Sequence, residues 1–382
     1  MEVINESEKN KIFDRQLRLW GVKAQNRMMN ANVLIAGLSG INIEICKNLI
    51  LNGINITIID DNIVDEELVE NVFFLNKKDL DKFVCIPIFK ELKSINQLIN
   101  IKAYIGRIDI ENGSIIIDEE LVYNENKTND NTTKNDNTNT SIILSEKRNL
   151  CYKIDDYISN YTCVCISCEE HPLYKLTNIN DQCHNKNIGC FATMCNGKFA
   201  FLFSDFGQYI MEESYYKTKE KEKTEPIKHK QLNDSTNHTG QNSNNINNNI
   251  NTTAETFKIE YSPLSHVLNV PFEKFDKKTN QIIFYLFALI LFEQDKKFEK
   301  KNKIINEQDF IQFCQNFSLL KNEQYLKEVS KMYKINFCLS SSIMGGVTSQ
   351  EIRKFVSKQH ESIPNFCVFD MNQNIVCTSM IT

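Results

Sequence analysis

The stretch that decides the fold runs from Asn32 to Asp61 and reads NVLIAGLSGINIEICKNLILNGINITIIDD. Its first part, Val33 to Ala36, is a short apolar run that ends at Gly37. Such a run is typical of a buried parallel strand that breaks into a tight loop. Apolar residues then recur every four positions, as on one face of a helix, at Ile41, Ile45 and Leu49.

A second strand follows the predicted helix. Asn52 and Gly53 form a helix stop, and an apolar run from Ile54 to Ile59 ends in Asp60. Strand, glycine loop, helix, strand and terminal acid make the first unit of a nucleotide-binding α/β fold. In such a unit the helix N-terminus favours phosphate and the acid can hold ribose.

The glycine fingerprint of this unit is incomplete. Gly37 fills the first position of G-x-G-x-x-G, but Ser39 and Asn42 occupy the second and third, with Gly40 between them. The second glycine normally lets pyrophosphate approach the backbone, and the third lets helix and strand pack closely. The loop therefore predicts poor nucleotide binding, or a buried βαβ unit without a ligand.

Composition sets the broad class. The chain has 382 residues, 13 cysteines and a formal net charge of −5, so we expect no nucleic-acid partner. An odd number of cysteines and a polar start without a secretory signal predict reduced thiols in an intracellular protein. The longest apolar run, Ile282 to Phe292, is too short to cross a bilayer and predicts a buried helix, with no membrane association.

The segment from Ile12 to Met29 is predicted to be mostly helical, with a break at Gly21. Arg15 and Arg18 are three residues apart and share a face, and Asp14 can pair with Arg18. By itself this pattern also describes a solvated basic face on an amphipathic helix.

The motif FDRQLRLWG at Phe13–Gly21, the loop GLSG at Gly37–Gly40 and the run KNLIL at Lys47–Leu51 resemble the opening of activating enzymes for ubiquitin-like proteins. The resemblance is to the small, Aos-type subunits of SUMO-activating enzymes. It implies a Rossmann-like α/β adenylation fold of the ThiF/MoeB type, with a mixed parallel and antiparallel sheet and low-complexity insertions.

The resemblance also implies a role. Such a chain pairs with a larger, cysteine-bearing subunit, and the pair adenylates the C-terminus of SUMO with ATP and Mg²⁺, in the nucleus or the cytoplasm. Arg15 stands where the family has an arginine that reaches across the interface toward the ATP phosphates on the partner. A guanidinium there can offset charge that develops on a phosphate.

Other positions depart from the pattern of the active halves. Asp60 matches the ribose-binding acid, but Asn62 replaces the second acid of the pair. The Asn-x-x-Arg-Gln pattern of the active halves would begin at Asn71, but the chain reads NVFF there and lacks its phosphate-facing arginine. Glu169 replaces the magnesium-binding aspartate, although a glutamate can still ligate a hard cation. We therefore expect Gly37, Gly40 and Asp60 to form at most a degenerate nucleotide site.

A helix is predicted over Ile343 to Lys358, capped by Ser340–Ser342. Gly345, Gly346 and Gln350 in this helix match family positions at the subunit interface, where we also expect Arg18 and Trp20. An internal, tightly packed helix would carry the same paired glycines.

The whole chain, 1–382, is predicted to be one ThiF-type domain. Residues 11–31 form its N-terminal helical segment, and 257–382 complete the fold and the dimer interface. Two polar tracts, 119–147 and 215–256, are rich in asparagine, threonine or charged residues and are predicted to be disordered insertions. Between them, Asn196-Gly197 flanked by the apolar arms of Cys190 to Phe203 predicts a β-hairpin.

The cysteines allow three interpretations. Cys163, Cys165 and Cys168 cluster in the sequence, and Cys183, Cys190 and Cys195 follow downstream. This pattern fits core packing, a zinc site, or a nucleophile for an acyl adenylate. We favour core packing and predict no metal site, because the spacing lacks the usual pairs of zinc ligands and neither Cys190 nor Cys195 follows a long inserted domain.

Three other functions share parts of the pattern. The regulatory subunit that activates the cullin-modifying ubiquitin-like protein shares the motif at Phe13–Gly21. A dinucleotide-dependent oxidoreductase would use Gly37 and Asp60. A non-catalytic scaffold would need neither.

Overall fold

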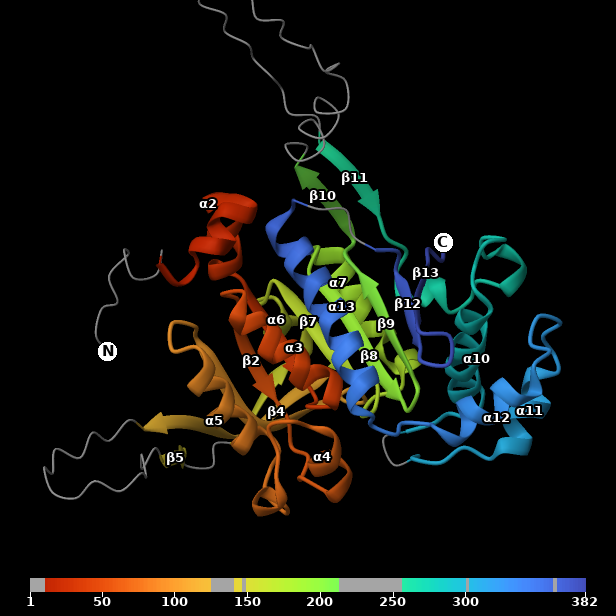
Figure 1. The fold of residues 1–382 in the computed structure, drawn as a ribbon, viewed down its shortest axis with the longest axis horizontal. Helices are drawn as coiled ribbons and strands as arrows, with labels where there is room; N and C mark the ends of the chain where they lie inside the picture. Colours follow the sequence, from red (N-terminus) through yellow and green to blue (C-terminus); the bar gives the residue numbers. More distant parts are fainter. Residues whose placement is uncertain (1–10, 125–140, 146–148, 213–255, 300–301, 360–362) are drawn as a thin grey trace, which may run out of the picture.

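A large mixed sheet with helices on both faces forms the body of the molecule (Figure 1). The computed structural model describes residues 11–124, 141–145, 149–212, 256–299, 302–359 and 363–382. The 11-stranded sheet has the order β13-β12-β9-β8-β7-β1-β2-β3-β4-β5, with β6 also paired to β4. The predicted α/β fold with a mixed sheet is confirmed.

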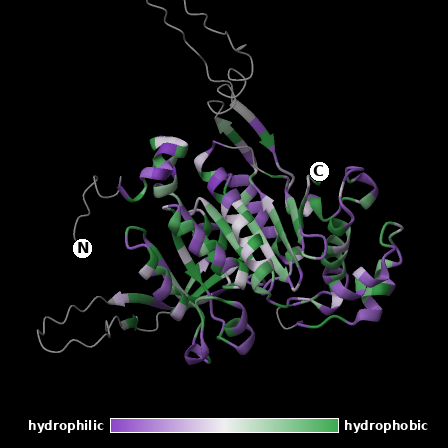
Figure 2. Cartoon of the chain, viewed as in Figure 1, coloured by the Kyte–Doolittle hydropathy of each residue, from purple (hydrophilic) through white to green (hydrophobic). Residues whose placement is uncertain are grey.

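The centre of the sheet is parallel. Its strands are β1 (Asn32–Ala36), β2 (Asn55–Ile59), β3 (Ile101–Asp109), β7 (Cys163–Ser167) and β8 (Gly189–Asn196). They pair in the order β3-β2-β1-β7-β8. Buried runs rather than alternating patterns form β1, β2, β7 and β8, because helices cover both faces of the sheet there (Figure 2). β3 instead alternates buried and exposed positions over much of its length.

Antiparallel strands extend both sides of this centre. One side adds β9 (Phe199–Asp205), β12 (Phe366–Asp370) and β13 (Ile375–Ser379), and the other adds β4 (Ser114–Asn124), β5 (Ser141–Leu144) and β6 (Leu150–Lys153). The predicted hairpin is confirmed: β8 and β9 pair from Cys190 to Asp205. Gly197 turns the chain there with φ of 61°.

Two hydrophobic cores lie on opposite faces of the sheet. One contains buried residues of α2, α3, α4, α5 and α13, and the other those of α6, α7, α9, α10, α11 and α12. The helices of the first core are α2 (Asp14–Asn30), α3 (Gly40–Leu51), α4 (Glu66–Asn71), α5 (Cys85–Ile95) and α13 (Cys338–Ser357). Those of the second are α6 (Ile154–Ile158), α7 (Thr177–Lys186), α9 (Leu264–Val267), α10 (Gln281–Asp295), α11 (Glu307–Cys314) and α12 (Glu323–Lys331).

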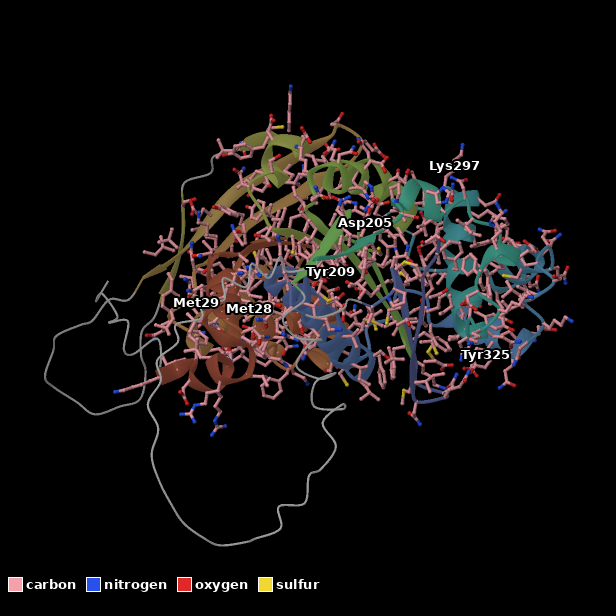
Figure 3. The ribbon with its side chains drawn as sticks, turned by 90° about the horizontal axis from the view of Figure 1, so that it is seen from above. Met28, Met29, Asp205, Tyr209, Lys297 and Tyr325 are labelled. Carbon is pink, nitrogen blue, oxygen red and sulfur yellow. The ribbon has the colours of Figure 1, made fainter. Side chains whose placement is uncertain are left out.

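The helical predictions for α2, in the first core, and for α10, in the second core, are confirmed. α2 is helical except at Gly21, where φ of 82° interrupts it, and Met28 near its end is buried (Figure 3). α10 is buried along Ile282 to Ile290, as the apolar run predicts. Within the described residues, no helix has both the length and the apolar character to cross a membrane.

Two boundaries differ from the predictions. α13 begins at Cys338 rather than at Ile343, and Ser340–Ser342 lie inside its first turns instead of capping it. Part of the predicted disordered insertion 119–147 is ordered, because Leu121 to Asn124 of β4 pair with β5. Its residues 125–140 and 146–147 lie outside the described residues.

The second predicted insertion, 215–256, lies outside the described residues except for Thr256. Strands β10 (Gln208–Glu212) and β11 (Thr256–Glu260) flank it and pair with each other. They project from the body as a two-stranded arm (Figure 1).

Candidate functional site

The candidate site lies at the carboxyl ends of β1 and β7, where the order of the parallel strands reverses. The loop from Gly37 to Gly40 leaves β1 and enters α3, and the loop from Cys168 to His171 leaves β7. Open α/β sheets bind ligands in the crevice at such a switch point. The glycine loop predicted between the first strand and its helix lies at this point.

Glu170 faces the glycine loop. Gly37 has φ of 80°, and a Cβ built on it would lie 2.8 Å from Cδ and Oε1 of Glu170 and 3.0 Å from Cβ of Ser167. Glu170 is buried, and the side chain of Asn62 donates a hydrogen bond to its Oε1. A carboxylate therefore occupies the space in front of the first glycine, where it repels a phosphate.

Asp60 uses its oxygens within the chain. Its Oδ2 accepts hydrogen bonds from Leu38 N (2.8 Å) and Asn62 Nδ2 (2.9 Å), and its Oδ1 accepts one from Asn62 N (3.1 Å). A carboxylate offers about four lone-pair sites, so little acceptor capacity remains for a ribose. Burial, followed by the nearby Glu170, raises the pKa of Asp60 well above its usual range.

The N-terminus of α3, where a phosphate would bind, is occupied by α13 and the loop before it. Gly40 N donates to Asn336 Oδ1 at 3.2 Å, and Ser39 Oγ accepts from Asn42 N at 3.4 Å. A Cβ on Gly40 would lie 2.8 Å from Ser341 Oγ. The positive end of the helix is thus satisfied by an amide and a hydroxyl of the same chain.

Asn42 stands at the third glycine position and is fully buried. Its Nδ2 donates to Gly37 O at 2.8 Å, and its Oδ1 accepts from Thr193 Oγ1 at 3.0 Å. The side chain therefore ties the glycine loop to β8. A side chain here stabilises the loop in one conformation, which a glycine could not do.

Glu169 bonds to Asn336 and to the backbone of β8, and none of its atoms is among those nearest to Gly37. Asn336 Nδ2 donates to its Oε2 at 3.0 Å, and Cys195 N donates to its Oε1 at 3.4 Å. Burial raises the pKa of Glu169 to about 8, although both hydrogen bonds lower it. The sequence pointed to Glu169 as the acid of this loop, but Glu170 is the one that lies against Gly37.

A buried lysine lies near these acids. Lys334 is 8% exposed and its Nζ has no hydrogen-bond partner among the described residues. Burial lowers its pKa, while Glu293, Cys168, Glu169 and Glu170 raise it. Its charge offsets part of the negative charge below the loop.

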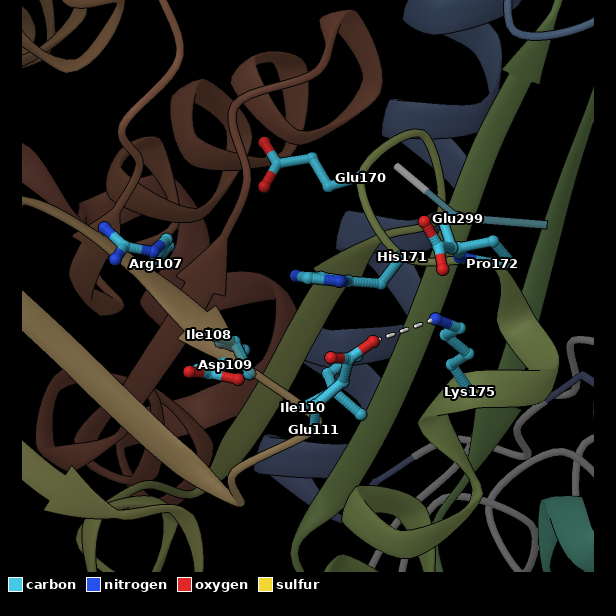
Figure 4. A pocket seen from close by; sticks show the side chains of 10 residues that line it. All are labelled: Arg107, Ile108, Asp109, Ile110, Glu111, Glu170, His171, Pro172, Lys175 and Glu299. Atoms are coloured by element: carbon cyan, nitrogen blue, oxygen red, sulfur yellow. Dashed lines mark ion pairs between the residues drawn. The ribbon is translucent and has the colours of Figure 1, made fainter. Parts of the chain in front are cut away.

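Beside this filled region lies an open cavity of about 400 Å³ (Figure 4). It takes its walls from the end of β3 and the segment after it, and from the segment after β7. The lining residues are Arg107, Ile108, Asp109, Ile110, Glu111, Glu170, His171, Pro172, Lys175 and Glu299. Lys175 Nζ lies 3.6 Å from Glu111 Oε1, and Arg107 lies 3.6 Å from Asp61 and 3.7 Å from Asp118. Lys175 and Glu111 therefore pair within the lining, whereas the acids that pair with Arg107 lie outside it.

The predicted residues of α2 lie apart from this crevice. Arg15 is exposed. Arg18 is exposed and pairs with Asp14 at 3.0 Å, as the spacing predicts. Trp20 is half-buried: the Arg353 guanidinium lies 4.9 Å from its ring centroid, and its Nε1 donates to Gln25 at 3.0 Å.

The three predicted residues of α13 differ in surroundings. A Cβ on Gly345 would lie 2.5 Å from Cβ of Glu44 and 3.1 Å from Ile41 O, so this glycine serves close packing against α3 within the chain. Gly346 has open space around it. Gln350 is exposed and accepts two hydrogen bonds from Arg353, at 2.9 and 3.1 Å.

The clustered cysteines are core residues. Cys163, Cys165, Cys168, Cys190 and Cys195 are all buried. Burial raises the pKa of Cys195 to about 12, which disfavours the nucleophilic thiolate. In the part of the chain that the structure describes, no group of three or more metal-ligating side chains is placed to hold a metal ion.

The fold and the crevice define a class: an α/β protein built on a nucleotide-binding unit whose phosphate end is closed by its own side chains. The ThiF family model matches residues 13–381, and the chain belongs to the ThiF family.

Known relatives extend over almost the whole chain. The chain is 24% identical to SUMO-activating enzyme subunit 1 of Xenopus tropicalis, over 96% of this chain and 94% of that protein. It is 22% identical to SUMO-activating enzyme subunit 1 of Homo sapiens, over 94% and 91%. It is 23% identical to DNA damage tolerance protein RHC31 of Saccharomyces cerevisiae, over 94% and 93%.

Among solved structures, that of PaaA has a TM-score of 0.52 and 10% identity, and the match covers 100% of this chain and 86% of that one. At this identity the likeness concerns the fold alone.

Proposed function

We propose that this chain is the non-cysteine subunit of a heterodimeric SUMO-activating enzyme. It supports adenylation of the SUMO C-terminus at an ATP and Mg²⁺ site on a larger, cysteine-bearing partner, before the thioester forms on that partner. The relatives of nearly equal length that are named SUMO-activating enzyme subunit 1 support this role.

One observation carries the proposal. The phosphate end of the chain's own crevice is occupied by Glu170 in front of Gly37 and by Asn336 at the N-terminus of α3. These residues do not fit a triphosphate, so we assign no step of the reaction to this crevice. The chain contributes instead through its surface.

Arg15 is the residue that we assign to the reaction. It is exposed on the first turn of α2, where its guanidinium is available to a partner subunit. A guanidinium binds phosphate oxygens through two donors at once and stays charged, which suits charge that builds on a phosphate during adenylation. Its role is therefore in trans.

ATP–pyrophosphate exchange tests the proposal. It is measured in the presence of SUMO with this chain alone, with the large subunit alone and with both. We expect exchange only in the mixture. Exchange by this chain alone would contradict the proposal. No exchange in the mixture, when the large subunit is folded and dimerises, would also contradict it and favour the activating enzyme of the cullin-modifying protein.

A further inference from the structure

β4 pairs with two different strands along its outer edge, and the pairing changes in the middle of β4. Ser114 to Ile117 pair with β6, and Leu121 to Asn124 pair with β5. On the other side of β4, the register with β3 shifts: Ile105 lies opposite Glu119, and Gly106 lies opposite Ile117. Asp118 is thus the extra residue of a β-bulge, and bulges commonly redirect side chains next to binding sites.

Gly106 makes the bulge possible. A Cβ on Gly106 would lie 2.3 Å from Ile116 O and 3.1 Å from Cα of Ile117. The backbones of β3 and β4 therefore approach more closely here than a side chain would allow. The bulge is a built feature of the sheet edge, fixed by residues on both strands.

A small cavity of about 100 Å³ lies at this bulge. It combines aromatic, acidic and apolar side chains from β3, β4, β6 and α6, which are Tyr104, Ile117, Glu119, Glu120, Leu150, Tyr152 and Tyr157. Its lining is wholly different from that of the cavity in Figure 4. None of the described residues that line it is basic.

Three of the lining residues are tyrosines, and two of them form an aromatic pair. The centroids of Tyr152 and Tyr157 are 5.3 Å apart with an interplanar angle of 47°, and Tyr161 lies behind Tyr157 at 5.6 Å. Burial raises the pKa of Tyr157, so its phenol stays neutral. Tyr152 is 39% exposed, which leaves the cavity accessible from solvent.

We propose that this cavity binds the side chain of a lysine on a partner protein. Ring faces attract an ammonium, and a carboxylate such as Glu119 strengthens the attraction through a charge-assisted hydrogen bond. Ile117 and Leu150 can contact the methylenes of the lysine stem. Sites for drug-sized molecules hold several hundred Å³, so this cavity suits one side chain rather than a nucleotide. The proposal is independent of the function proposed above.

Ligand-observed NMR titration of the full chain tests it, with Nα-acetyl-lysine methylamide as the probe and the norleucine analogue as its uncharged control. We expect saturable binding of the lysine probe and none of the control. Tyr152→Leu and Glu119→Gln should each weaken binding about three- to tenfold. Asp156→Asn, which removes an exposed charge from α6 outside the cavity, should leave binding unchanged.

Equal binding of the two probes, or no binding of either, would overturn the proposal. So would unchanged affinity in both Tyr152→Leu and Glu119→Gln. Circular dichroism shows whether each variant is folded. If Tyr152→Leu does not fold, the affinity of Glu119→Gln decides whether the proposal stands. Glu119 is partly exposed, and the substitution keeps the size of its side chain.

Discussion

The crevice at the end of β1 is filled by side chains of the same chain, whereas the outer face of α2 presents a basic side chain to solvent. In the crevice, Glu170 and Asn336 occupy the places that a phosphate would take. On the first turn of α2, Arg15 is exposed. A nucleotide-binding unit can thus keep its fold while side chains of the same chain fill the phosphate end of its crevice. The residue that we propose for the reaction lies on the surface instead.

The largest effect that we expect comes from the α2 face. With the cysteine-bearing subunit and SUMO, Arg15→Ala should slow ATP–pyrophosphate exchange about 10²–10³-fold, as for loss of one donor to a developing charge. Dimerisation, measured by sedimentation, should persist. Lys23→Ala, a change to another exposed basic residue of α2, is the matched control and should leave exchange near that of the unchanged protein. Normal exchange by the heterodimer that carries Arg15→Ala would contradict the role that we propose for Arg15.

The next effect belongs to the crevice. The folded-state pKa of Glu169, about 8, lies above its ordinary value of 4.5. Protonated Glu169 therefore makes its full contribution to the free energy of unfolding below pH 4.5. That contribution is lost as pH rises toward 8, because the unfolded chain releases the proton at a lower pH than the folded chain does. Relative to Glu169→Gln, the unfolding free energy should fall by about 4 kcal/mol between pH 4.5 and pH 8.5.

Urea unfolding at both pH values measures this difference. Asp156→Asn serves as the control, because an exposed carboxylate should show no such dependence. Parallel pH profiles for the unchanged protein and Glu169→Gln would show that this carboxyl is not held in its protonated form by the closed crevice.

A smaller effect should follow from the close packing of α13 against α3, at Gly345. Gly345→Ala places a methyl group 2.5 Å from Cβ of Glu44. We expect a loss of about 1–3 kcal/mol in the free energy of unfolding, because α13 must move away from α3. Chemical denaturation measures it, and an unchanged midpoint would mean that the two helices separate at little cost.

The smallest effect is the counterpart on the outward side of α13. Gly346→Ala meets open space and should stabilise the isolated chain by about 0.5–1 kcal/mol, through helix propensity alone. A destabilised variant would show that Gly346, like Gly345, serves an internal contact.

The sequence predicted those parts of the fold that depend on neighbouring residues. The unit β1-α3-β2, the hairpin at Asn196-Gly197 and the buried helix α10 each have a local pattern, because strand and helix periodicity and turn chemistry act over a few residues. The start of α13 was misplaced because Phe337 caps it without a side-chain hydrogen bond. A serine run further on gave the stronger capping signal.

The closure of the crevice could not be predicted in the same way. Asn336 reaches Gly40 across 296 positions of the chain, and neither residue has a signature that points to the other. The departure at Asn42 could be read from the sequence, because this residue replaces the third glycine of the fingerprint. Glu170 was missed because its neighbour Glu169 fits the family position, and only the path of the loop after β7 decides which acid faces Gly37.

ATP stoichiometry in the assembled heterodimer shows whether Glu170 and Asn336 exclude a nucleotide from this chain. Equilibrium dialysis with labelled ATP, Mg²⁺ and both purified subunits counts the bound nucleotides. We expect one ATP per heterodimer, held by the cysteine-bearing partner, and none bound to this chain alone. Two ATP molecules per heterodimer, or saturable binding to this chain alone, would show that Glu170 and Asn336 yield to a triphosphate, and would contradict this expectation.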